Sequence, residues 1–103
     1  MENSIILRKN NKIVARTIED EIVLIPISQT AKEMNYIYTL NKPASEVWNL
    51  INGKRAIKDI KKIILKKFDV TPDEVDKEIK TLIKDLKQVN AVLETGSNRK
   101  NKI

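Results

Sequence analysis

The side chains in this sequence that could do chemistry are acidic and basic ones, because it contains neither cysteine nor histidine. A chain without these residues has no thiolate nucleophile, no imidazole general base, no disulfide and none of the common zinc sites. The 14 acidic and 20 basic side chains follow no spacing that would assemble a recognisable catalytic site. The sequence therefore predicts no catalytic residue, no metal site and no cofactor, and it favours a binding protein over an enzyme.

The net charge of +6 makes a nucleic-acid-binding protein one alternative, since clustered lysines neutralise phosphates. Half of this excess lies in three basic residues of a polar C-terminal tail, "TGSNRKNKI". A second basic stretch runs from residue 54 to residue 67, and lysines between isoleucines are more often a solvated surface than a ligand site. If this stretch did contact phosphates, its contact residues would be Lys58, Lys61, Lys62 and Lys66.

The segment that would read DNA bases in a helix-turn-helix protein is acidic here. It begins "TPDEVDKE", and its four carboxylates would repel a phosphate backbone. The helix predicted there also lacks an arginine that could bind guanine through two hydrogen bonds. Nucleic-acid binding therefore ranks second among the functional hypotheses.

Three strands are predicted in the first half of the chain. Two runs rich in β-branched residues, 13–17 and 22–25, flank an acidic triplet and indicate a hairpin. The third strand is "YIYTL", residues 36–40, and its alternation assigns its side chains to two faces. Tyr36, Tyr38 and Leu40 would share one face, and Ile37 and Thr39 the other.

Three helices follow, because the apolar residues then recur about every 3.6 positions. The first begins near Pro43, contains Trp48 as a core residue, and has Gly53 as its expected C-terminal stop. The second is marked by four isoleucines between residues 57 and 64. The third begins at Thr71, an expected N-cap, followed by Pro72 in the first turn.

This order predicts an α+β fold, winged-helix-like, with a three-stranded antiparallel sheet followed by three helices. We expect one domain over residues 1–94, with residues 1–11 as a flexible segment and residues 95–103 as a disordered basic tail. No stretch approaches the roughly 20 apolar residues of a membrane span, and the N-terminal apolar run is too short for a signal peptide. The expectation is a cytoplasmic protein without a membrane partner.

In a sheet ordered as its strands follow in the chain, residues 36–40 form an edge strand. That strand has no charge, proline or glycine to discourage another chain from pairing with it. An extended peptide could add to this edge by β-augmentation. Two alternatives stay open: the N-terminal segment "SIILRK" could cover the edge, or a second copy of the protein could do so.

The stretch "LNKPASEVWNLINGKRAIKDI", followed by "FDV", an acidic helix start and "LIKDL", resembles the PqqD-like family of precursor-peptide recognition elements. These elements serve the biosynthesis of ribosomally made and then modified peptides. The resemblance covers residues 12–94. The matching positions are Leu40, Asn41, Ala44, Val47, Trp48, Leu50, Ile51, Asn52, Gly53, Arg55, Ile57, Ile60, Val70, Leu82 and Leu86.

The resemblance implies a non-catalytic domain that binds the leader segment of a precursor peptide and presents it to a modifying enzyme, often a radical S-adenosylmethionine enzyme. In the family the leader adds as a strand to the third strand and lies beside the third helix. The residues that this assigns to peptide binding are Tyr36, Ile37, Tyr38, Thr39, Leu40, Val75, Asp76, Ile79, Lys80, Ile83 and Lys84.

The sequence departs from the family pattern in two places. Ala56 stands where the family usually has a threonine, which removes an N-cap side chain from the second helix. The connection "SQTAKEMN" lacks the glycines of the family's shorter turn, so the start of the edge strand is not defined. The oligomeric state stays open between a monomer and a weak homodimer through the edge strand.

Overall fold

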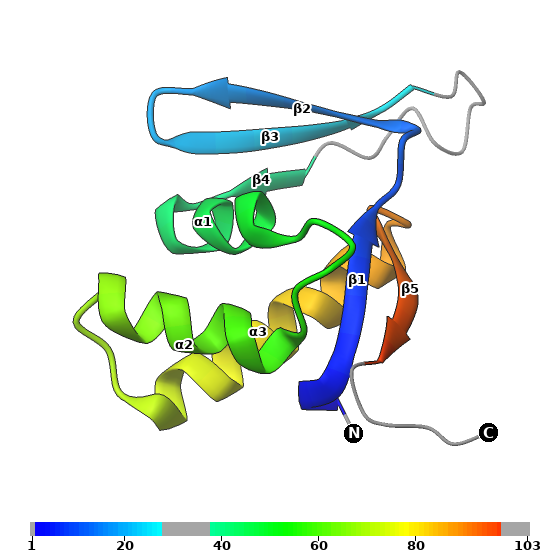
Figure 1. Cartoon of the computed structure of the whole chain (residues 1–103). Coiled ribbons are helices and arrows are strands. Elements are labelled where there is room, and N and C mark those ends of the chain that lie inside the picture. Colours follow the sequence, from blue (N-terminus) through cyan, green and yellow to red (C-terminus); the bar gives the residue numbers. More distant parts are fainter. Residues whose placement is uncertain (1, 28–37, 98–103) are drawn as a thin grey trace, which may run out of the picture.

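Two antiparallel sheets and three helices form the described part of the computed structural model, residues 2–27 and 38–97 (Figure 1). The elements are, in chain order, the 3-10 helix η1 (Glu2–Ser4), β1 (Ile5–Lys9), β2 (Ile13–Ile18), β3 (Glu21–Pro26), β4 (Tyr38–Leu40), α1 (Lys42–Leu50), α2 (Ile57–Lys67), α3 (Pro72–Gln88) and β5 (Val92–Ser97).

The three-stranded sheet has the order β2-β3-β4 and is antiparallel throughout, which confirms the predicted α+β class. Strands β2 and β3 pair from Ile13 with Pro26 to Ile18 with Glu21, so Glu19 and Asp20 form the hairpin turn. Strand β4 pairs with β3 over three residues. Two residues of the predicted third strand, Tyr36 and Ile37, lie outside the described residues.

The helix boundaries follow from local capping. Helix α3 begins with the predicted N-cap: the Thr71 side chain accepts from the Glu74 N–H, and the Glu74 carboxylate accepts from the Thr71 N–H. Helix α2 has Ala56 at its N-cap position and no side-chain cap, as its alanine implied. No helix in the described part of the chain is long and apolar enough to cross a membrane.

The first helix ends earlier than predicted. It stops at Leu50, because Ile51 leaves the helical conformation with ψ 114° and buries its side chain in the core, 1% exposed. Gly53 therefore does not cap the helix. It has a φ of +80°, which favours glycine, and its N–H donates to the Leu7 carbonyl of β1 at 2.9 Å.

The N-terminal segment contains a strand, β1, that the sequence patterns did not predict. Strand β1 pairs antiparallel with β5 in a second sheet, with a bulge between Ile6 and Leu7. The Leu7 side chain is 1% exposed and belongs to the core. Strand β5 extends to Ser97, past the predicted domain end at residue 94. Pairing of the two chain ends is a long-range contact, which explains why local patterns did not indicate it.

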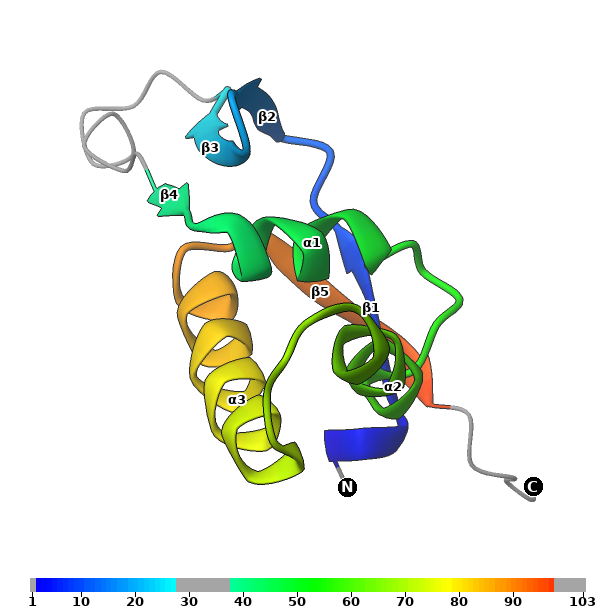
Figure 2. The same cartoon turned by 90° about the vertical axis from the view of Figure 1, so that its left-hand side faces the viewer.

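The core lies where the three-stranded sheet, the helices and β1 meet (Figure 2). Trp48 is 3% exposed, as predicted for a packing residue, and the Lys9 Nζ lies 5.2 Å from the centre of its ring. That distance allows a cation–π interaction. The most deeply buried large side chains are Leu7, Leu40, Ile51 and Leu86, which come from four different elements or their ends.

Candidate functional site

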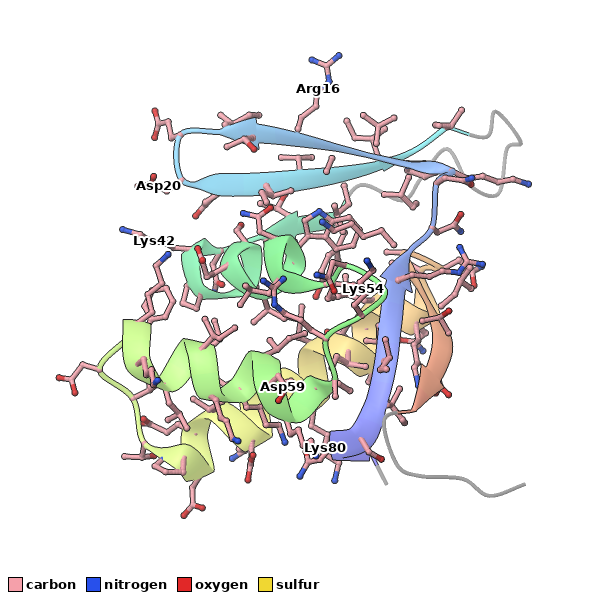
Figure 3. All side chains as sticks on the ribbon, in the orientation of Figure 1. Arg16, Asp20, Lys42, Lys54, Asp59 and Lys80 are labelled. Atoms are coloured by element: carbon pink, nitrogen blue, oxygen red, sulfur yellow. The ribbon has the colours of Figure 1, made fainter. Side chains whose placement is uncertain are left out.

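Strand β4 forms one edge of the three-stranded sheet, and no described residue pairs with its outer side. The N-terminal segment does not cover it, because β1 pairs with β5 instead. This removes one of the alternatives left open by the sequence. The other edge, β2, differs in character: Arg16 projects from it away from the helices (Figure 3), and neither groove described below reaches β2.

A buried serine at the end of the β3–β4 ladder indicates which backbone groups of β4 face β3 and which face the open edge. The Ser45 hydroxyl accepts from the Ile22 N–H and donates to the Leu40 carbonyl, both at 3.0 Å. The Ile22 N–H and the Leu40 carbonyl therefore face each other through this hydroxyl. Backbone direction alternates along an antiparallel strand. The N–H and C=O of Thr39 consequently point outwards, to the open edge.

A groove runs beside β4 between α1, the end of α2 and α3, and we call it the β4–α3 groove. Its volume is about 240 Å³. Apolar side chains supply most of its lining, which consists of Tyr38, Asn41, Pro43, Ala44, Val47, Ile64, Phe68, Val70, Val75, Glu78, Ile79, Thr81, Leu82 and Asp85. An open backbone edge and an apolar groove thus lie next to each other, which is the arrangement that an added strand requires.

Two side chains bridge the strand and the helix across this groove. The Tyr38 hydroxyl donates to Asp85 Oδ2 at 3.2 Å. Burial raises the pKa of the Tyr38 phenol, and the charge of Asp85 and its hydrogen bond raise that pKa further. The phenol is therefore neutral near pH 7, and it remains a donor to the carboxylate. This contact ties the position of β4 to that of α3.

The opposite flank of α3 lines a second groove, which we call the lysine groove. It lies beside η1, β1 and α2, and its volume is about 630 Å³. Lys80 lines this groove and lies close to the start of β1 in the view of Figure 3. The residues that line it are Asn3, Ile5, Ile57, Lys61, Asp76, Ile79, Lys80, Thr81, Ile83, Lys84 and Lys87.

The structure separates the residues that the sequence assigned to one peptide site. Tyr38, Val75 and Ile79 line the β4–α3 groove. Thr39 is exposed on the edge, and Leu40 is buried in the core. The remaining four predicted residues of α3 line only the lysine groove, away from β4, and these are Asp76, Lys80, Ile83 and Lys84.

Three residues of α3 that line the β4–α3 groove alone were absent from the predicted set: Glu78, Leu82 and Asp85; Thr81, which lines both grooves, was absent too. The first three are spaced four and three residues apart, which places them on one flank of the helix. That regularity is visible in the sequence. Which flank meets the strand, however, depends on how α3 crosses beneath the sheet, and helical periodicity alone carries no such information.

The lysines of the nucleic-acid alternative are not equivalent. Lys61 is only 16% exposed, and its Nζ lies 2.8 Å from Asp76 Oδ1 and 2.7 Å from Asn3 Oδ1. Asp76 thus neutralises the least exposed lysine of that set. Among the residues that the structure describes, no group of three acidic side chains is placed to hold a metal ion.

Comparison with known proteins gives one family and one fold. The sequence matches the family described as coenzyme PQQ synthesis protein D (PqqD) over residues 21–92. The structure is similar to that of TbiB1 in complex with the TbiA(beta) leader peptide, with a TM-score of 0.69 and 18% sequence identity. That match covers 82% of this chain and 93% of TbiB1, and at this identity it shows a shared fold. No curated protein sequence matches the chain.

Proposed function

This chain belongs to the PqqD family, and from that premise we propose that it binds the leader segment of a ribosomally made precursor peptide. In this proposal the leader adds as a strand to the outer edge of β4, and its side chains enter the β4–α3 groove. The protein then presents the bound peptide to a modifying enzyme and contributes no catalytic residue itself.

The observation that carries the proposal is the position of the outward-facing Thr39 backbone beside the β4–α3 groove. Main-chain hydrogen bonds give an added strand its affinity, and side-chain pockets give it specificity. Here an open backbone edge lies beside a groove that can hold side chains. The shared fold with TbiB1, which holds a leader peptide, is consistent with this use of the fold.

The charges of α3 also support a peptide rather than a nucleic acid as the ligand. Glu78 and Asp85 line the groove beside β4, and Asp73 and Glu74 lie in the first turn of the helix. These carboxylates would repel phosphates. They complement the positive end of the helix dipole or a basic peptide side chain instead.

The test is a binding titration with leader segments of candidate precursor peptides encoded in the same genome. Each leader carries a fluorescent label, its anisotropy is followed as protein is added, and a shuffled leader of the same composition serves as the control. We expect saturable binding of one leader and none of its shuffled form. If no leader binds while duplex DNA does, with an affinity that falls steeply with salt, the nucleic-acid alternative replaces this proposal.

A further inference from the structure

The charges on α3 are divided between its two flanks. The β4–α3 groove contains two carboxylates, those of Glu78 and Asp85, and no lysine or arginine among its lining residues. The lysine groove on the other flank contains four lysines. About one residue in five of this chain is basic, with 20 lysines and arginines in 103 residues. A groove without any basic residue, beside the open edge, is therefore a distinct electrostatic environment.

Neither carboxylate of this groove forms an ion pair with a described residue. The acidic partners in the ion pairs of the described chain are Asp20, Asp76, Glu46 and Glu94. Asp85 accepts a hydrogen bond from Tyr38, which is neutral and leaves its charge uncompensated. Glu78 is exposed and lies two turns before Asp85 on the same flank. Together they present negative charge to whatever occupies the groove.

The geometry of an added strand determines which side chains would meet these groups. Alternate residues of a strand point to the same face of a sheet. Ligand residues beside Tyr38 and Leu40 would therefore point into the groove, two positions apart. The groove offers them an apolar floor of Val47, Ile79 and Leu82 together with an acidic rim. A lysine or arginine can lay its aliphatic stem along apolar side chains while its charge reaches the rim.

We infer that the β4–α3 groove selects peptides with a large apolar residue and a lysine or arginine two positions apart, both pointing into the groove. The apolar side chain fills the floor, and the basic side chain lies near the negative charges of Glu78 and Asp85 on the rim. This inference rests on the proposed function, because it assumes that the peptide is a strand on β4. It names the chemical class of peptide that this particular edge accepts.

A displayed library of random short peptides tests the inference without knowledge of the natural leader. Selection is run in parallel on the wild-type protein, on Glu78→Lys, and on Lys80→Glu, which reverses a charge two residues away on the lysine-groove flank. Both substituted positions are exposed, so both variants should fold. We expect wild type and Lys80→Glu to enrich a basic residue two positions from an apolar one. Glu78→Lys should enrich an acidic residue there.

The affinities of the enriched peptides then measure how strong the charge preference is. Replacing the basic residue of a selected peptide by glutamate should weaken binding to wild type about fivefold or more at low salt, the scale of one exposed ion pair. The same replacement should strengthen binding to Glu78→Lys. Added salt should reduce both preferences.

Two different results would contradict two different claims. The inference is wrong, and strand addition stands, if the enriched peptides lose affinity for Thr39→Pro but show no charge preference. The same conclusion follows if they show the same charge preference on Glu78→Lys as on wild type. If no peptide is enriched, or if the enriched peptides bind Thr39→Pro as well as wild type, strand addition on β4 is wrong, and the proposed function with it.

Discussion

The Tyr38 hydroxyl donates a 3.2 Å hydrogen bond to the Asp85 carboxylate and so joins the edge strand β4 to the helix α3. The two residues are 47 positions apart in the chain. They belong to the two elements between which the peptide would lie. A strand of only three described residues thus has a side-chain anchor on the opposite wall of the groove.

Removing this anchor should cost stability. Tyr38→Phe deletes the hydroxyl, and we expect the free energy of unfolding to fall by about 1 kcal/mol, since the bond is partly exposed and its acceptor is charged. Urea denaturation measures this change. Asp85→Asn tests the same contact from the other side and should have a smaller effect, because an amide oxygen can still accept. A Tyr38→Phe protein as stable as wild type would show that the contact does not anchor β4.

The same contact predicts a pH dependence at the alkaline end. The folded pKa of Tyr38 is raised, so the neutral phenol is favoured in the folded state. Its stabilising contribution is fully present below the unfolded pKa of about 10 and is lost as the pH rises through the folded value. Absorbance at the tyrosinate band, taken as the difference between wild type and Tyr38→Phe, isolates this residue from Tyr36. Asp85→Asn should lower the pKa of Tyr38; an unchanged titration would contradict the role of Asp85.

Ser45→Ala should destabilise the protein, because the Ser45 hydroxyl bonds to both strands of the β3–β4 ladder. The substitution leaves the Ile22 N–H and the Leu40 carbonyl without the hydroxyl that joins them, in a buried position. An unsatisfied buried group costs roughly 1–3 kcal/mol. We expect a loss in that range by urea denaturation, together with weaker peptide binding because β4 is less firmly held. Wild-type stability would mean that the two backbone groups pair directly once the hydroxyl is gone.

The N-terminal strand should prove essential to the fold. Leu7→Ala opens a cavity at a side chain that is 1% exposed, and such changes cost about 2–5 kcal/mol. The neighbouring Arg8→Ala is the matched control, since Arg8 is exposed and its change should stay within about 0.5 kcal/mol. Thermal unfolding of the two variants compares them directly. Equal stability would mean that β1 contributes nothing to the core.

Thr39→Pro should weaken peptide binding without unfolding the protein. The substitution removes the outward N–H and places a ring at the edge where the ligand strand would approach. We expect affinity to fall at least about fivefold, since the lost hydrogen bond alone contributes about 1 kcal/mol and the ring adds a steric cost. Thr39→Val keeps the N–H and the shape of the side chain, and it should bind like wild type. Circular dichroism of each variant checks that the fold is retained.

Much of the fold could be predicted because its signals are local. The hairpin, the Thr71 N-cap and the missing cap at Ala56 each depend on residues within a few positions of one another. The pairing of β1 with β5 does not, because it joins the two ends of the chain. An apolar run such as "SIILRK" has no local partner, so its place in the core becomes apparent only once the helices are packed.

The candidate site could be predicted from the sequence only as far as the strand and the helix beside the groove. The edge position of β4 followed from the order of the strands. The choice of flank on α3 did not follow, because both flanks combine apolar and charged residues at helical spacing. Ile79 lies between the two flanks of α3 and borders both grooves. The flank of α3 that faces β4 is the one that carries Asp85, as its hydrogen bond with Tyr38 shows.

The most direct test of strand addition on β4 is the backbone amide spectrum of the isotope-labelled protein during titration with its tightest-binding peptide. We predict that the Thr39 amide signal shifts most, in the direction of hydrogen-bond formation, with smaller shifts at Glu78 and Leu82 and none at Lys80 and Lys84. A Thr39 signal that stays in place at saturating peptide, with shifts confined to the lysine groove, would contradict strand addition on β4.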